Sequence, residues 1–192
     1  MNLPLDAGAE MRILAWLDTL ASWNAKLDLT AARSPEELVD LMVADALVLA
    51  QHVAPSATVI DIGTGAGAPG FALACLRPDI HAHLVDPLAK RISFLRVAGA
   101  EAGVSNLTLH LGALEKVEAS LPRGAEVMAR ATFAPPIWFE RAKAELKQPA
   151  KIWIFLAKEP IPSGFDAALE LDYCWPMTDV ARKLVATSGA SD

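Results

Sequence analysis

A glycine-rich segment is the part of this sequence best suited to binding a ligand. It runs from Asp61 to Gly70, reads DIGTGAGAPG, and lies between a short apolar run and a stretch with helical character. Glycines at 63, 65 and 67 can adopt positive φ and carry no Cβ that would keep a ligand away from the backbone. Ligands of open α/β sheets bind at the carboxyl ends of strands. The segment therefore predicts a binding loop rather than a plain strand-to-helix turn.

Two kinds of cofactor are compatible with this loop. Residues 65–70 fit the GxGxxG pattern, in which a helix N-terminus receives the pyrophosphate of a dinucleotide. On that interpretation the chain is an NAD-linked oxidoreductase. S-adenosylmethionine has no phosphate and carries a sulfonium and an amino-acid group, so an acid at the loop entrance suits it better. Asp61 occupies that position, and the sequence favours S-adenosylmethionine.

A second acid closes the next predicted strand. Asp86 ends the run HAHLVD, which begins at His81. A carboxylate at this place can accept both hydroxyls of a ribose. The same side chain could cap a helix that begins at Leu88, and one residue can serve both purposes. Residues 112–115, after the third predicted strand, would approach an adenine.

Two helices are expected before the glycine-rich segment. From Ala7 to about Lys26, apolar residues recur at spacings of three and four, as on one stripe of a helix. The run SPEE from Ser34 supplies an N-cap, a first-turn proline and a capping-box acid for a second helix that reaches about His52. We expect these helices to form an N-terminal helical extension of residues 1–54.

After residue 55, short apolar runs alternate with helical stretches, which predicts a parallel sheet covered by helices. Strands are expected at residues 58–62, 82–85, 107–111, 127–131 and 152–156, and helices at 69–76, 88–101, 114–120 and 136–147. Residues 168–173 and 183–187 are expected to add two antiparallel strands. The predicted fold class is α/β, with a mostly parallel seven-stranded sheet in a cofactor-binding core of residues 55–192.

Composition limits the class of protein. A chain of 192 residues that is 53% hydrophobic can bury one substantial core but not two, so residues 1–192 should form a single domain. The net charge of −6 argues against a protein that grips nucleic acid over its whole surface, although residues 88–96 and 141–158 are locally basic. With no basic leader and no apolar run of about 18 residues, we expect a cytoplasmic protein without membrane contact.

Cysteine and histidine positions do not indicate a metal site. Cys75 and Cys174 lie far apart, and the four histidines have no ligand spacing. His81 and His83 share one face of a predicted strand, whereas His110 is isolated in the sequence. No metal is expected.

Three segments, in order along the chain, resemble one family. They are WNAKLDLT from Trp23 with Arg33 after it, the glycine-rich VIDIGTGAGAPG, and LVDPLAKRISFLR from Leu84. From about residue 10 to about residue 158 the chain resembles the glucose-inhibited division protein B family, which comprises small-subunit rRNA guanine-N7 methyltransferases. The resemblance implies a Rossmann-like class I methyltransferase fold, S-adenosylmethionine as cofactor, and 16S rRNA or the small ribosomal subunit as partner. It leaves the oligomeric state open.

The loop pattern and the resemblance together suggest functions for individual residues. Arg130 matches the family's Ser-Arg-Ala-Phe segment and is expected to orient the guanine, with Asp45 at the edge of the same cleft. Cofactor contacts are expected from Asp61, Gly63, Thr64, Gly65, Gly67, Gly70, Asp86, Ala113, Leu114 and Glu115. RNA contacts are expected from Asn24, Arg33, Lys90, Arg91 and Arg96.

Four positions depart from the family's pattern. Met42, Ala113, Ala129 and Glu159 stand where the family usually has a histidine, an arginine, a serine and a glycine, respectively. These substitutions leave open a non-catalytic paralogue that binds the cofactor and acts as an interaction protein.

Overall fold

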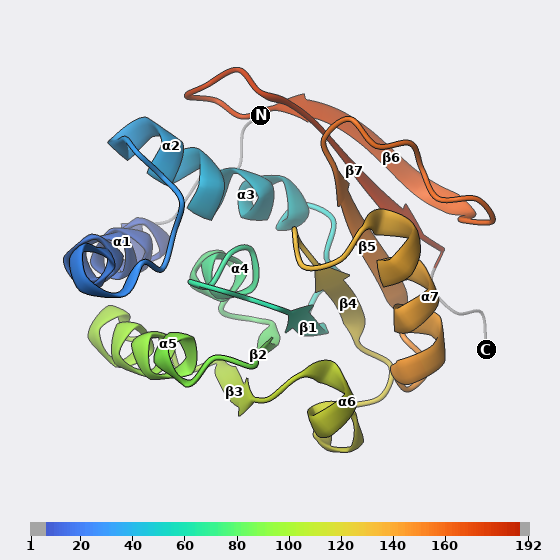
Figure 1. Cartoon of the computed structure of the whole chain (residues 1–192), viewed down its shortest axis with the longest axis horizontal. Coiled ribbons are helices and arrows are strands. Elements are labelled where there is room, and N and C mark those ends of the chain that lie inside the picture. Colours follow the sequence, from blue (N-terminus) through green and yellow to red (C-terminus); the bar gives the residue numbers. More distant parts are fainter. Residues whose placement is uncertain (1–6, 189–192) are drawn as a thin grey trace.

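A seven-stranded sheet forms the centre of the computed structural model, which describes residues 7–188 (Figure 1). The strand order is β3-β2-β1-β4-β5-β7-β6. The strands β1 to β5 pair in parallel, and β7 runs antiparallel to both β5 and β6. The predicted mostly parallel seven-stranded sheet is confirmed. The strands are β1 (Thr58–Ile62), β2 (His81–Asp86), β3 (Leu107–Leu111), β4 (Glu126–Ala129), β5 (Lys151–Leu156), β6 (Ala167–Cys174) and β7 (Ala181–Thr187).

Helices cover both faces of the sheet (Figure 1). On one face the early helices share an apolar core that includes Trp16, Phe71 and Leu95. On the other face α7 packs on β5, around the buried side chains of Trp138 and Ile154. The helical elements are α1 (Ala7–Leu27), α2 (Pro35–Val39), η1 (Asp40–Ala44), α3 (Asp45–Leu49), α4 (Gly70–Leu76), α5 (Ala89–Ala102), α6 (Leu114–Val117), η2 (Glu118–Ser120) and α7 (Pro135–Glu145).

The N-terminal helices support the glycine-rich loop directly. Helix α1 packs against α4 and α5, and the indole N–H of Trp16 donates to the carbonyl oxygen of Ala66 at 3.1 Å. The N-terminal helices therefore share a core with the sheet. None of the helices within residues 7–188 is long and apolar enough to cross a membrane.

The second helix begins as predicted but contains a π-helical turn. The hydroxyl of Ser34 accepts the N–H of Glu37 at 3.2 Å, and the Glu37 carboxylate accepts the N–H of Arg33 at 2.8 Å. The elements α2, η1 and α3 then follow one another without a break, and η1 is a π-helix. The helix ends at Leu49, earlier than the expected end at about His52.

Strand β4 is shorter than the sequence predicted. It was expected to reach residue 131, but its pairing with β5 ends where Ala129 lies opposite Ile154. Ala131 has φ of 55°, and a left-handed residue cannot continue a strand. The prediction that the strand extends through Arg130 and Ala131 is therefore wrong, because both residues lie in the segment that follows it.

Candidate functional site

The strand order reverses between β1 and β4. Strand β1 leads outward to β2 and β3, whereas β4 leads to β5 on the other side. The loops that leave their carboxyl ends diverge, and ligands of open α/β sheets bind in the crevice between such loops. The loop after β1 is the glycine-rich segment, and the loop after β4 begins at Arg130.

Gly65 presents open backbone to this crevice. Gly63, Gly65 and Gly67 have φ of 75°, 61° and 111°, so all three adopt the positive φ expected from the sequence. A Cβ added to Gly65 would meet only the carbonyl oxygen of Gly63, at 3.9 Å. The space beside Gly65 is therefore available to a ligand.

The other glycines of the loop are packed against protein atoms. A Cβ on Gly63 would overlap the side chain of Thr132, and one on Gly67 would lie 2.7 Å from Cβ of Phe71. A Cβ on Gly70 would lie 2.7 Å from the Asp61 side chain. Gly67 and Gly70 are buried, and their close packing leaves no room for a side chain; their predicted cofactor contacts remain predictions.

Two buried polar atoms near the loop have no hydrogen-bond partner. Asp61 is 1% exposed, and its Oδ2 accepts the N–H of Gly70 at 2.9 Å. Asp61 Oδ1 and Thr64 Oγ1 are buried without a partner within residues 7–188. Burial raises the pKa of Asp61 to about 6, against the opposing effects of the nearby Thr64 hydroxyl, the Gly70 N–H and the charge of Arg130. Because unpartnered buried polar atoms are costly, these two suit a ligand that carries hydrogen-bond donors.

Asp86 links the glycine loop to helix α5. Its Oδ2 accepts the N–H of Gly65 at 3.0 Å and an N–H of Arg91 at 3.1 Å, and its Oδ1 accepts the N–H of Leu88 at 2.9 Å. The contact with Leu88 is not the helix cap that the sequence left open, because α5 begins at Ala89 and Leu88 is its N-cap residue. Each carboxylate oxygen can accept two hydrogen bonds, so Oδ1 retains acceptor capacity for a ribose hydroxyl.

Two adjoining cavities lie at the crevice. We call the first the loop cavity; it measures about 340 Å³ and is lined by residues 29–31, 41, 42, 63–66, 68, 86, 87, 91 and 130–132. We call the second the hairpin cavity; it measures about 270 Å³ and is lined by residues 41, 45, 130, 131, 133, 135, 155–157, 159, 175 and 182. Leu41, Arg130 and Ala131 line both cavities. The loop cavity is at the lower end of the range of volumes for small-molecule sites, and the hairpin cavity is just below it.

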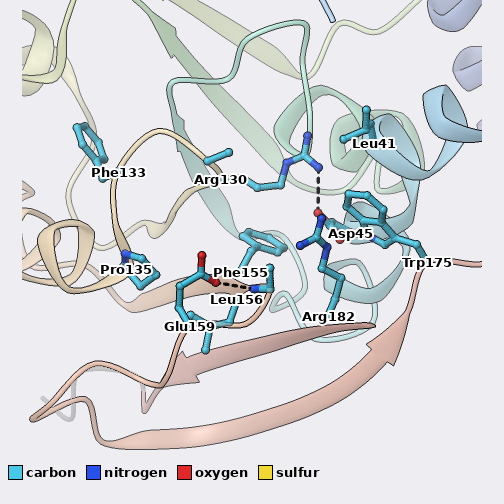
Figure 2. Close-up of a pocket in the computed structure, with 12 residues that line it drawn as sticks. Leu41, Asp45, Arg130, Phe133, Pro135, Phe155, Leu156, Glu159, Trp175 and Arg182 are labelled. Carbon is cyan, nitrogen blue, oxygen red and sulfur yellow. Dashed lines mark hydrogen bonds and ion pairs between the residues drawn. The ribbon is translucent and has the colours of Figure 1, made fainter. Parts of the chain in front are cut away.

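Arg130 stands at the boundary between the two cavities. Its Nη1 donates to Oδ2 of Asp45 at 3.0 Å (Figure 2). Its Nε is buried and has no partner among the described residues. A guanidinium has five N–H donors in a rigid plane, so Arg130 can stay bound to Asp45 and still donate to a ligand.

Two of the residues expected to bind RNA also hold the end of α1. Asn24 Oδ1 accepts the N–H of Leu29 at 2.6 Å and that of Thr30 at 2.9 Å. Lys90 Nζ donates to the carbonyl oxygen of Leu27 at 2.8 Å, and a cation there also favours a helix C-terminus. Both side chains position the segment that carries residues 29–31 to the loop cavity.

The three predicted RNA-binding arginines occupy different environments. Arg91 forms an ion pair with Asp86 and lines the loop cavity, so it is placed at the cofactor side of the crevice. Arg33 and Arg96 are exposed and form no ion pair within residues 7–188. These two remain available to phosphates.

The basic segment at residues 141–158 is largely paired with acids. Arg141 forms ion pairs with Glu145 at 2.6 Å and with Glu115. Lys143 lies 3.5 Å from a carboxylate oxygen of Glu140. Glu115 is exposed, and residues 113–115 lie outside the lining of both cavities. The predicted adenine contacts of Ala113, Leu114 and Glu115 thus remain predictions.

Comparison with known proteins identifies the family. Residues 10–157 match the model of the GidB family, described as rRNA small subunit methyltransferase G. The chain belongs to this family. It is 34% identical over 169 residues to ribosomal RNA small subunit methyltransferase G of Anaeromyxobacter dehalogenans, covering 88% of this chain and 79% of that protein. The enzyme of the same name from Neisseria meningitidis serogroup A is 33% identical over 174 residues, covering 91% and 82%. The family resemblance predicted from three segments is confirmed.

A solved structure supports the fold assignment. An O-methyltransferase from Bacillus cereus, in complex with SAH, matches with a TM-score of 0.63 and 16% identity, covering 91% of this chain and 90% of that one. At this identity the likeness concerns the fold. The predicted Rossmann-like methyltransferase fold is confirmed.

Sequence reasoning missed residues that come from distant parts of the chain. Trp16 supports the glycine loop across 50 positions, and Tyr173 and Trp175 contact Asp45 across 128 and 130 positions. No local pattern marks such contacts. The one hint in the sequence was the rarity of aromatic residues. They make up 6% of the chain, and Tyr173 is its only tyrosine.

Proposed function

We propose that this chain transfers a methyl group from S-adenosylmethionine to N7 of a guanine in 16S rRNA of the small ribosomal subunit. The main support is that two adjoining cavities share Arg130 in a chain that belongs to an rRNA methyltransferase family. Adjoining sites hold two reactants in contact and thereby lower the entropic part of the barrier. A ribosomal substrate places the reaction in the cytoplasm.

The loop cavity fits S-adenosylmethionine. Bound there, the cofactor supplies an electrophilic methyl group on a sulfonium. The open backbone at Gly65 leaves room for it, and Asp86 Oδ1 has acceptor capacity for a ribose hydroxyl. The buried Thr64 hydroxyl, which lines this cavity, suits the polar amino-acid end, whereas Asp61 lies outside the lining. A pyrophosphate would find no matching charge at Asp61, and family membership favours the methyl donor over a dinucleotide.

Arg130 is the residue best placed to act on the base. Guanine N7 already has a free lone pair, so it can attack the methyl carbon without a general base. The chain's contribution is then to align the nucleophile and to exclude water. From the boundary between the cavities, the Arg130 guanidinium can donate to O6, which neighbours N7, and so orient the base.

RNA recognition relies on few charges. The net charge is −6, and the basic segment near residues 141–158 is largely neutralised by acids. Exposed Arg33 and Arg96 supply phosphate contacts, and so few contacts give modest, sequence-independent affinity. The folded RNA of the subunit must therefore contribute shape recognition.

A methyl-transfer assay tests the proposal. Undermethylated small subunits are incubated with the protein and radiolabelled S-adenosylmethionine, and the modified nucleotide is mapped. We expect label at N7 of one guanine of 16S rRNA. Arg130→Ala should lower kcat by about 100-fold, as for the loss of a preorganised donor.

A thermal shift assay separates the alternatives. S-adenosylhomocysteine should raise Tm because it binds only the folded chain, whereas NAD should not. Stabilisation by NAD alone would support the oxidoreductase. Stabilisation by S-adenosylhomocysteine without methyl transfer to any subunit preparation would support the non-catalytic paralogue.

A further inference from the structure

Asp45 is a buried carboxylate that receives donors from two other parts of the chain. The Tyr173 hydroxyl donates to its Oδ1 at 2.6 Å, and the Trp175 indole N–H donates to the same oxygen at 2.7 Å. Its Oδ2 accepts from Arg130 Nη1 at 3.0 Å. Figure 2 shows the guanidinium of Arg130 directed at Asp45, with Trp175 and Arg182 beside the pair. Asp45 is 4% exposed, so these contacts lie out of solvent.

The π-helical turn explains why two acids face the C-terminal hairpin of β6 and β7. Five residues along an α-helix are about 140° apart around the axis, so Asp40 and Asp45 would point in different directions. The i→i+5 spacing of a π-helix brings such residues to the same side, and the π-turn spans residues 40–44. Single π-turns of this kind often occur at functional sites.

Asp40 makes similar contacts but does not touch Arg130. Its Oδ1 accepts the N–H of Met177 at 3.2 Å, and its Oδ2 accepts the N–H and hydroxyl of Thr178 at 2.8 and 2.7 Å. Asp40 is fully buried. Both acids thus anchor the hairpin, and only Asp45 continues to the boundary of the cavities.

Arg130 requires such support. Its long side chain leaves a turn in which Ala131 has φ of 55°, and an unrestrained guanidinium would sample many rotamers. Within residues 7–188, Asp45 is the carboxylate that pairs with it. The hydroxyl of Tyr173 remains a donor to that carboxylate, because burial and the charge of Asp45 raise the pKa of Tyr173 well above its usual range.

We propose that Asp45 is a positioning residue for methyl transfer, which fixes the Arg130 guanidinium between the two cavities and is itself held by Tyr173 and Trp175 of the C-terminal hairpin. This inference rests on the proposed function. It assigns the hairpin, which lies beyond the family match at residues 10–157, a function in orienting the base.

Asp45→Asn is the first test. The amide oxygen can still accept from Tyr173 and Trp175, but the amide NH₂ then faces the donating guanidinium, so the Arg130 contact is lost. We expect kcat for undermethylated small subunits to fall by about 10- to 100-fold, the range expected for a misplaced catalytic group. The KM for subunits and the calorimetric Kd for S-adenosylhomocysteine should stay unchanged.

Asp40→Asn is the matched control. It perturbs a second buried carboxylate of the same helix and the same hairpin, without touching Arg130. Both variants should lose thermal stability, but only Asp45→Asn should lower kcat. Equal loss of kcat in the two variants would show that Asp45 acts only by holding the fold together, and would overturn the inference.

A double-mutant cycle gives the sharper answer. If Asp45 acts through Arg130, adding Asp45→Asn to Arg130→Ala should cost no further activity, because residues that act as a unit are non-additive. Full additivity would contradict the inference. Should Asp45→Asn fail to fold, Tyr173→Phe, which removes one donor to Asp45, replaces it in the same cycle with a smaller expected loss. Absence of methyl transfer by the wild type would instead refute the proposed function.

Discussion

The loop cavity and the hairpin cavity share a wall but are assembled over different distances along the chain. The central contacts of the loop cavity are local: Gly65 reaches Asp86 across 21 positions, and Arg91 reaches Asp86 across five. The hairpin cavity depends on contacts from Asp45 to Arg130 across 85 positions and to Trp175 across 130. The central contacts of the cofactor side therefore lie within a short βαβ segment, although residues 29–31, 41, 42 and 130–132 also line its cavity, whereas the base side depends throughout on contacts between distant parts of the chain.

This difference predicts separable effects of substitution. Changes in the loop cavity should alter cofactor affinity, and changes around the hairpin cavity should alter kcat while cofactor affinity stays constant. Arg130 lines both cavities, so it is the residue at which the two effects meet.

The largest effect is expected at Gly65. Gly65→Val should abolish measurable binding of S-adenosylhomocysteine, because a β-branched residue is strained at φ of 61° and its side chain would fill the open space beside the loop. Gly103→Val is the control, since Gly103 has φ of 65° and nothing within 4 Å of an added Cβ. Calorimetry on both variants separates strain from obstruction. Retained binding by Gly65→Val would refute the loop as a cofactor site.

Asp86→Ala should have the next largest effect. Loss of hydrogen bonds to a charged group costs about 1.5–3 kcal/mol, which corresponds to an affinity for S-adenosylhomocysteine lower by about 10- to 100-fold. Part of that loss would come from the glycine loop, because Asp86 also accepts the N–H of Gly65. Calorimetry on a variant shown to be folded by circular dichroism makes the measurement. An unchanged Kd would mean that the ribose is held elsewhere.

The difference between local and long-range contacts also explains which features the sequence could predict. The strands, the Ser34 cap and the positive φ of Gly65 follow from local patterns, and the structure has each of them. The end of β4 could not be predicted, because it depends on the left-handed conformation of Ala131, a residue type that normally avoids it.

Long-range partners were equally beyond local reasoning. No local pattern showed that Lys90 also binds the end of α1, across 63 positions. His110 looked isolated, but the parallel pairing of β2 with β3 brings its Nε2 to 2.9 Å from Nδ1 of His83. Strand register decides such neighbours, and the local sequence of one strand does not specify how it aligns with the next.

A smaller effect is expected at Arg33, which lines a separate surface pocket between α1 and α2. Arg33 follows residues 29–31 of the loop-cavity lining and is exposed. Arg33→Ala should weaken binding to small subunits and reduce the slope of log affinity against log salt by about 0.7–0.9, the contribution of one phosphate contact. Affinity for S-adenosylhomocysteine should not change. Filter binding at several salt concentrations provides both quantities.

Arg123→Ala is the control for Arg33. Arg123 is also exposed, but it precedes β4 and so lies toward the amino ends of the strands, away from the crevice. Its side chain donates to Gln148 at 2.8 Å. Equal reductions of the salt slope in the two variants would indicate diffuse attraction, and would remove Arg33 from the RNA-binding residues.

The smallest expected effect concerns His83, which lies on β2 but lines neither cavity. Burial, and then the charges of His110 and His81, lower its pKa to about 4. Between about pH 6.5 and pH 4 the unfolded chain therefore binds a proton that the folded chain does not, so this group lowers stability as pH falls. Asp61 acts in the opposite direction, because its raised pKa of about 6 makes the folded chain the stronger proton binder below that pH.

His83→Asn isolates the histidine contribution. Between pH 7 and pH 5 the wild type should lose more stability than the variant, by on the order of 1 kcal/mol once solvent access to this half-buried side chain is taken into account. Urea unfolding of both proteins at the two pH values measures the difference, and equal m values ensure a common unfolded state. Parallel pH profiles would mean that His83 takes up its proton as readily in the folded chain as in the unfolded one. Because His83 lines neither cavity, the ratio of kcat between wild type and variant should stay constant from pH 7 to pH 5. A ratio that changed with pH would show that the β2–β3 edge of the sheet is coupled to the loop cavity.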